Sequence, residues 1–205
     1  MSNQFFNRLI SNKLFPKLTW LRFIGFEFWM VGFTPFFIGY VISSRELFSL
    51  ELLYGFLIIA FLTSSTFVLN HICDFDLDKK NPRKEFSLLV RGNINIQQSW
   101  YLFWTLQILC LLLSLNVNFE FFYCISSLTF ISFIYNVKPF RLKTRPGLDL
   151  ISNGVSLGFF IPLAAWSINQ PIIEFPRLYF LSIICYLLAL YCPTMALDVE
   201  FDRKF

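Results

Sequence analysis

The chain has 205 residues, of which 56% are hydrophobic, 20% are aromatic and only 15% are charged. Soluble domains usually contain about 25% charged residues, so this composition excludes an ordinary water-soluble domain and also an intrinsically disordered chain. The formal net charge of +4 is informative only through the positions of the charges. These figures point to a protein of the lipid bilayer.

Six apolar segments with few or no charges follow one another along the chain. Each is long enough to cross a hydrocarbon core about 30 Å thick as a helix. We therefore predict an all-α, polytopic transmembrane helix bundle that forms a single domain over residues 1–205, in which Glu27 is the only charged residue more than one residue from the end of a span. The predicted spans are residues 23–44, 52–72, 99–116, 119–136, 150–169 and 178–197.

The Lys and Arg residues are distributed unevenly between the two sides of these spans. All but two of the 17, Arg45 and Arg177, lie near the N-terminus, in the loops after the second and fourth spans, or at the C-terminal end. Because cytoplasmic loops carry an excess of Lys and Arg, both termini and these two loops are predicted to be cytoplasmic. Every Asp residue lies on the same side, although topology rules do not require acids to segregate.

Two acidic clusters stand at the cytoplasmic ends of predicted spans. In the first, Asn70, Asp74 and Asp78 are spaced by four residues and share one helix face. In the second, Asp198 and Asp202 have the same spacing at the end of the sixth span. Carboxylate pairs of this kind suit Mg²⁺, which binds through one or two carboxylates together with substrate phosphates. A solvated helix end with mixed charges is the alternative for either cluster taken alone.

The loop after the fourth span is strongly basic, with Lys138, Arg141, Lys143 and Arg145 close together. Basic residues at this place could simply anchor the topology. Next to two Mg²⁺-type clusters they also suit a clamp for phosphate oxygens, because Arg provides paired planar donors and Lys a point charge. The sequence contains no Walker loop, so it offers no support for nucleotide hydrolysis.

Three stretches together resemble the UbiA superfamily of intramembrane prenyltransferases, in the order in which that family has them. Within that superfamily, residues 81–84 and 145–149 are similar to lycopene elongases and chlorophyll synthases. The stretches are residues 70–84, which resemble the first aspartate-rich motif, residues 135–154, which resemble the loop after the fourth helix, and residues 198–204, which resemble the second aspartate-rich motif.

The resemblance implies a helical bundle with a membrane-buried cavity, and Mg²⁺-dependent transfer of a prenyl group from a polyprenyl diphosphate to a lipophilic acceptor. It implies a multi-pass protein of a bacterial-type cell membrane whose active site faces the cytoplasm, with no nucleic-acid partner. The implied Mg²⁺ ligands are Asn70, Asp74, Asp78, Asp198 and Asp202. The implied diphosphate-binding residues are Asn70, Lys138, Arg141, Lys143, Arg145 and Asn153, and Tyr135 joins the four Asp residues as a catalytic residue at the mouth of the cavity.

The chain departs from the family pattern in three ways. His71 stands where the family usually has Asp, and Lys138 is one residue closer to Tyr135 than in a common form of the motif. The family fold also has about nine helices, so we expect either a fragment or a short product completed by a partner chain.

Two other functions compete with prenyl transfer. A non-catalytic or transporter-like protein would also have six spans, although a transporter should carry acids near the middle of its spans. A phosphatidyl-group transferase also places Asp and Mg²⁺ at helix ends, but its D-G-x-x-A-R stretch does not occur in this sequence.

Overall fold

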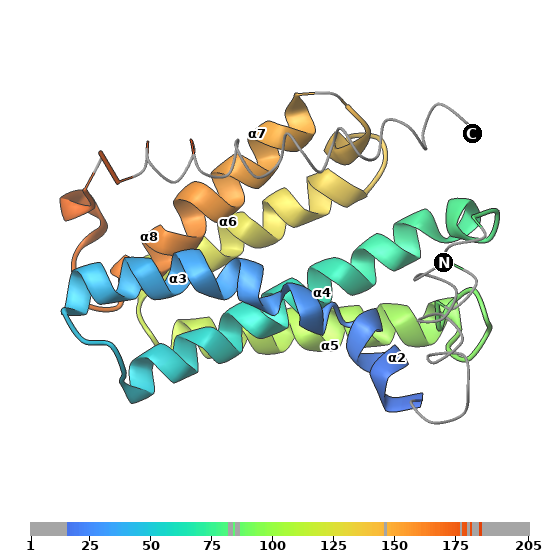
Figure 1. Cartoon of the computed structure of the whole chain (residues 1–205), viewed down its shortest axis with the longest axis horizontal. Coiled ribbons are helices and arrows are strands. Elements are labelled where there is room, and N and C mark those ends of the chain that lie inside the picture. The colour runs from blue at the N-terminus through green and yellow to red at the C-terminus, as the bar shows by residue number, and fades with distance from the viewer. Residues whose placement is uncertain are drawn as a thin grey trace, which may run out of the picture.

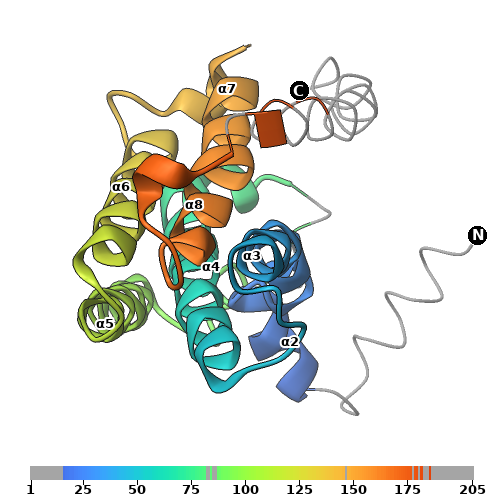
Figure 2. The same ribbon diagram turned by 90° about the vertical axis from the view of Figure 1, so that its left-hand side faces the viewer.

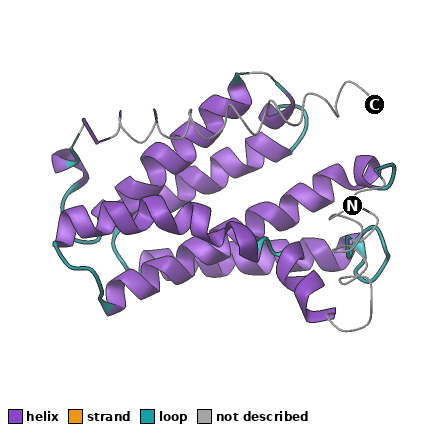
Figure 3. Cartoon of the chain, in the orientation of Figure 1, coloured by secondary structure: helices purple, strands orange, loops and turns teal. Residues whose placement is uncertain are grey.

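The computed structural model describes residues 16–81, 84, 87–145, 147–176, 178, 179, 181 and 185. The regular structure over these residues is helical, without strands (Figure 3), so the all-α prediction is confirmed. Four stretches are long and apolar enough to cross a membrane, namely Phe26–Ser44, Leu50–Asp78, Ile96–Leu115 and Leu148–Trp166. Most of the sixth predicted span lies outside the described residues, so the count of six stays a prediction.

The first predicted span is interrupted near its start. Helix α2 (Pro16–Phe23) is separated from a short 3₁₀ turn and helix α3 (Trp29–Ser44) by Gly25. Gly25 has a φ of 66°, and a Cβ atom there would lie 2.4 Å from the ring of Phe67. Only glycine fits this left-handed and crowded position, which is why the chain bends there.

Helix α4 (Leu50–Asp78) is the longest element and extends six residues beyond the end predicted for the second span. Its start is capped by Ser49, whose hydroxyl accepts a 3.0 Å hydrogen bond from the amide of Leu52. Because the helix continues through Asp78, Asn70, Asp74 and Asp78 all lie on helix α4, as their spacing predicts.

The next helices follow the predicted limits closely. Helix α5 (Ile96–Leu115) begins with a capping box between Asn95 and Gln98. Helix α6 (Phe119–Asn136) has the limits predicted for the fourth span. It is not among the four strongly apolar stretches, because polar residues at both of its ends reduce its mean hydropathy.

The fifth predicted span forms one continuous helical stretch of three parts. Helix α7 (Leu148–Val155) leads through a π-helical turn (Ser156–Phe160) into helix α8 (Ile161–Trp166). Beyond it, a short 3₁₀ turn covers Ile172–Glu174.

The long helices pack as a closed ring in which α3, α4, α5, α6 and α8 each contact the next and α8 returns to α3 (Figure 2). The crossing of α3 and α8 is close because Gly39 has no side chain. A Cβ atom there would lie 2.5 Å from the carbonyl oxygen of Pro162. Small residues allow such approaches between membrane helices, where packing rather than the hydrophobic effect drives association.

Buried apolar residues form two clusters along this ring. The larger one fills the space between α3, α4, α6 and α8 and includes Phe36, Ile59 and Phe121, each fully buried. The smaller one includes Leu69 of α4, Leu88 of the turn that precedes α5 and Phe103 of α5, and it lies next to the acidic motif. The second cluster fixes the end of α4 that carries the motif.

Candidate active site

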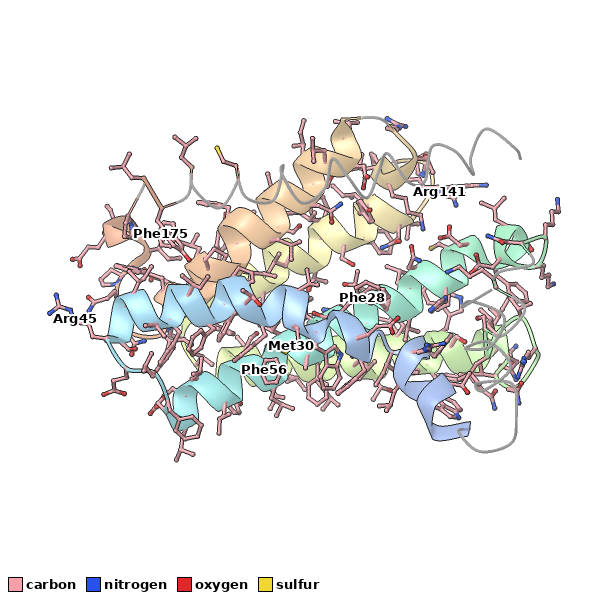
Figure 4. All side chains as sticks on the ribbon, viewed as in Figure 1. Phe28, Met30, Arg45, Phe56, Arg141 and Phe175 are labelled. Carbon is pink, nitrogen blue, oxygen red and sulfur yellow. The ribbon has the colours of Figure 1, made fainter. Side chains whose placement is uncertain are left out.

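The C-terminal ends of α4 and α6 and the loop of residues 137–145 lie at one end of the bundle (Figure 1). Figure 4 shows Arg141 at this end, whereas Arg45 and Phe175 lie at the opposite end. The fold therefore brings the first acidic motif and the basic loop together, as the sequence predicts.

Asp74 is the centre of the site. Its Oδ1 accepts a 2.5 Å hydrogen bond from Nη2 of Arg141, and its Oδ2 accepts a 2.7 Å bond from Nζ of Lys143. The three side chains are only 12–19% exposed. Because little water screens these ion pairs, the two basic residues are held firmly on the carboxylate.

The ammonium group of Lys143 is surrounded by three oxygens. Besides Asp74, it donates to Oδ1 of Asn70 at 2.6 Å and to Oδ1 of Asn136 at 3.1 Å. Asn136 is 1% exposed, and its amide nitrogen donates to the carbonyl of Ser132, which directs its oxygen toward Lys143. The charged cluster thus consists of Asn70, Asp74, Asn136, Arg141 and Lys143.

Asn136 belongs to the charged cluster but was not among the predicted site residues. It directly follows Tyr135 in the stretch that resembles the family loop, and a polar Asn at the end of an apolar helix is the sequence feature that could have indicated its role.

Arg141 adopts an uncommon backbone conformation, with a φ of 39°. Residues other than glycine rarely occupy the left-handed region, and such strain tends to occur where surrounding contacts hold a functional residue in place. Here the ion pair with Asp74 and a 2.9 Å hydrogen bond from the Arg141 amide to the carbonyl of Val137 provide those contacts. Within the part of the chain that is described, its Nε is buried and has no hydrogen-bond partner. That donor is available to an anion.

The side-chain oxygens of this cluster suit a hydrated Mg²⁺ ion as ligands. The carboxylate and amide oxygens of Asp74 and Asn70 already converge on one cationic atom, the Lys143 ammonium, and hard oxygen ligands are those that Mg²⁺ prefers. Among the described residues, this cluster included, no three or more His, Cys, Asp or Glu side chains are grouped so that they could hold a metal, so Asn70 and Asp74 are the ligands that this part of the chain offers. The second acidic motif, with Asp198 and Asp202, lies outside the described residues.

Asp78 is placed differently from Asn70 and Asp74. Its Oδ2 lies 3.9 Å from Nδ1 of His71, and the His71 ring stacks on Phe23 with 5.0 Å between the ring centroids. The residue that departs from the family pattern therefore packs against α2 and neighbours Asp78 rather than the ammonium of Lys143.

Tyr135 and Asn153 form a second group on the α7 side of α6. The Tyr135 hydroxyl donates a 2.6 Å hydrogen bond to Oδ1 of Asp149, and the Asn153 amide donates to the same oxygen at 3.0 Å. Asp149 was not among the predicted site residues, although it lies within the stretch that resembles the family.

The two remaining basic residues of the loop are exposed to solvent. Lys138 precedes Pro139 across a cis peptide bond, and Arg145 donates a 3.3 Å hydrogen bond to the Pro139 carbonyl. The structure therefore brings Arg141 and Lys143, but neither Lys138 nor Arg145, to Asp74.

Solved structures similar to this chain carry ligands of the predicted class. A UbiA homolog from Archaeoglobus fulgidus bound to GPP and Mg²⁺ superposes with a TM-score of 0.80 at 25% identity, over 91% of this chain and 65% of that one. The same homolog bound to DMAPP and Mg²⁺ gives 0.80 and 25% over 91% and 66%. A structure described as digeranylgeranylglyceryl phosphate synthase shares the fold, with a TM-score of 0.73 at 22% identity over 91% and 64%.

The chain thus spans about two thirds of the length of these solved structures. A search of curated proteins found no match. The profile of the UbiA prenyltransferase family matches residues 32–205, which include both acidic motifs and the basic loop. With its long apolar helices, the chain is an integral membrane protein and belongs to the UbiA prenyltransferase family.

Proposed function

We propose that this chain forms the diphosphate-binding part of a Mg²⁺-dependent enzyme that transfers a prenyl group from a polyprenyl diphosphate to a lipophilic acceptor within the membrane. The observation that carries the proposal is the charged cluster, in which two acidic-motif residues of α4 meet two basic residues of the loop after α6. Relatives of this fold bind GPP or DMAPP together with Mg²⁺, which supports the same ligand class here.

Arg141 and Lys143 bind the diphosphate in this proposal. Both form ion pairs with Asp74, and the buried Nε of Arg141 offers a further donor to a phosphate oxygen. Arg pairs well with phosphate because its planar group presents parallel donors. Bound Mg²⁺, with Asn70 and Asp74 among its ligands, supplies positive charge that favours departure of the diphosphate.

The reaction breaks the bond between the allylic carbon and the diphosphate oxygen, whose electron pair leaves with the pyrophosphate. The allylic carbon then bonds to the acceptor, which loses a proton. Water must be kept from this carbon, because water would capture it in place of the acceptor. The apolar helices and the many aromatic side chains of the bundle provide such surroundings.

The distribution of charge supports an active site on the cytoplasmic side. The charged cluster lies at the end of the bundle where the sequence concentrates its Lys, Arg and Asp residues, and both termini belong to that side in the proposed topology. Asp198 and Asp202 belong to the same family motif set and complete the proposed Mg²⁺ site. Segments of a longer chain, or a partner chain, would supply the remaining helices of the fold.

Isothermal titration calorimetry tests this proposal. The affinity of the purified chain in detergent for GPP is measured once with Mg²⁺ and once with EDTA. We expect Mg²⁺-dependent binding that is at least about tenfold weaker in Asp74→Asn, because a neutral amide neither balances two basic residues nor ligates Mg²⁺ as strongly as a carboxylate. Asp76→Asn is the matched control, because Asp76 is an exposed residue of the same helix.

Equal affinities in the two variants would remove Asp74 from the site. A wild-type chain that binds no GPP in the presence of Mg²⁺ would contradict the proposal and favour the non-catalytic or transporter-like alternative.

A further inference from the structure

A group of three residues beside the charged cluster is not used by the binding scheme above. Tyr135 of α6 donates its hydroxyl proton to Asp149 of α7, with 2.6 Å between the oxygens. Asn153, one turn further along α7, donates to the same carboxylate oxygen at 3.0 Å and approaches the Tyr135 oxygen at 3.4 Å. The amide of Asn153 also donates to the Asp149 carbonyl at 2.9 Å, which fixes its orientation.

The side chain of Asp149 is enclosed by its neighbours. Asp149 is nine-tenths buried and lies in the first turn of α7. Two hydrogen-bond donors from side chains reach one of its oxygens. A phenol that donates to a carboxylate in such surroundings is held in one orientation and carries more electron density on its oxygen and ring.

The location of Tyr135 connects this group with the proposed chemistry. Tyr135 directly precedes Asn136, whose side chain holds the Lys143 ammonium at 3.1 Å. The basic loop begins after these two residues, so Tyr135 lies in the last turn of α6, one residue from the charged cluster along the chain. An electron-rich aromatic group at that point stabilises positive charge that develops on an allylic carbon as its diphosphate leaves.

We propose that Asp149 is a positioning residue for prenyl transfer, which orients and polarises the Tyr135 phenol so that it stabilises the allylic cation, with Asn153 holding the carboxylate in place. This inference rests on the proposed function. It predicts an effect on ionisation of the prenyl diphosphate, not on its binding, because the Asp149 carboxylate accepts its side-chain hydrogen bonds from Tyr135 and Asn153.

The test compares Asp149→Asn, Tyr135→Phe and the double variant in the purified chain, with GPP as the probe and water as the acceptor. Water captures the allylic carbon and releases one proton and one pyrophosphate for each GPP, so released pyrophosphate measures ionisation. We expect each single variant to reduce the rate about tenfold, the double variant to be no slower than the slower single one, and the Kd for GPP with Mg²⁺ to stay within about twofold of the wild type. Ser152→Ala, in the same turn of α7, is the control and should keep the wild-type rate.

A second readout does not depend on turnover. With 3-fluorotyrosine incorporated at position 135, the ¹⁹F resonance reports the hydrogen bond of the phenol, and Asp149→Asn should shift it whereas Ser152→Ala should not. An unshifted resonance overturns the inference.

Other outcomes separate the inference from the proposed function. A wild-type rate in either single variant, additive losses in the double variant, or a loss of GPP binding equal to the loss of rate each overturns the inference alone. A wild type that binds GPP but releases no pyrophosphate also overturns it and leaves the binding site standing. A wild type that does not bind GPP with Mg²⁺ contradicts the proposed function itself.

Discussion

Two polar groups connect α4 with its neighbours, and they differ in charge and in position. The charged cluster lies at the end of α4 and joins it to the loop after α6. The neutral network lies in the middle of the bundle and consists of Ser65, Thr66, Gln107, Thr129 and Ser132. In it, Gln107 of α5 accepts from Ser65 at 2.9 Å and donates to Thr129 at 2.7 Å, and Ser132 of α6 donates to Thr66 at 2.9 Å.

The difference lies in what each group leaves unsatisfied. The hydroxyls of Ser65, Thr66 and Thr129 each also lie within hydrogen-bond distance of a carbonyl in the preceding turn, so the neutral network is complete without any ligand. The charged cluster contains a buried Arg141 Nε that lacks a partner among the described residues. Groups that are fully paired within the protein hold helices together, whereas an orphaned charged donor is suited to a ligand.

The largest effect is expected from Asp74→Ala, which removes the carboxylate that holds Arg141 and Lys143. Loss of one partner of a mostly buried ion pair costs about 2 kcal/mol or more, so the loop should detach. Trypsin should then cleave after Arg141 and Lys143 at least about thirtyfold faster than in the wild type. Lys138 and Arg145 precede prolines and resist trypsin, so cleavage reports the loop directly. Asp76→Ala should leave the cleavage rate unchanged, and an unchanged rate in Asp74→Ala would show that the charged cluster does not anchor the loop.

A smaller effect should separate the basic residues of the loop. Lys143→Met is expected to weaken Mg²⁺-dependent GPP binding about tenfold, because the ammonium beside Asp74 is lost from the diphosphate site. Lys138→Met removes the same charge from an exposed position five residues earlier and should change the affinity by about twofold or less. Titration calorimetry of both variants measures the difference. The reverse ranking would place the diphosphate nearer to Lys138 and contradict the geometry of the charged cluster.

The smallest effect is expected in the neutral network. Gln107→Leu removes two hydrogen bonds between helices, each worth about 0.6 kcal/mol on average inside membrane proteins, so unfolding should become easier by about 1 kcal/mol. Reversible unfolding in mixed micelles measures this change. GPP binding should stay within about twofold of the wild type. If binding were lost while stability was kept, the neutral network would belong to the substrate site and the contrast between the two groups would disappear.

Much of the fold could be predicted from local patterns. The limits of α6 agree with the predicted fourth span, and the four-residue spacing of Asn70, Asp74 and Asp78 correctly indicated a helix. The interruption at Gly25 was not predicted, because it depends on the ring of Phe67 from another helix. Helical periodicity is a local property, whereas a close approach between two segments is not.

The candidate site was predicted less completely. The sequence indicated which stretches belong to it, and Asp74, Arg141 and Lys143 do lie together. It did not indicate that Asp78 would lie beside His71, nor that Asn136 and Asp149 would bind Lys143 and Tyr135. Short polar residues are common at helix ends, and nothing in their own neighbourhood shows which partner they meet.

By itself, the sequence determined that this is an all-α protein of the membrane with its first acidic motif and its basic loop at helix ends. The physical reason is that a helix satisfies its backbone hydrogen bonds internally, so apolar length and charge position are enough to predict it. The tertiary structure alone decided which side chains meet. Arg141 and Asp74 are 67 positions apart, and only the packing of α6 against α4 brings their charges into contact.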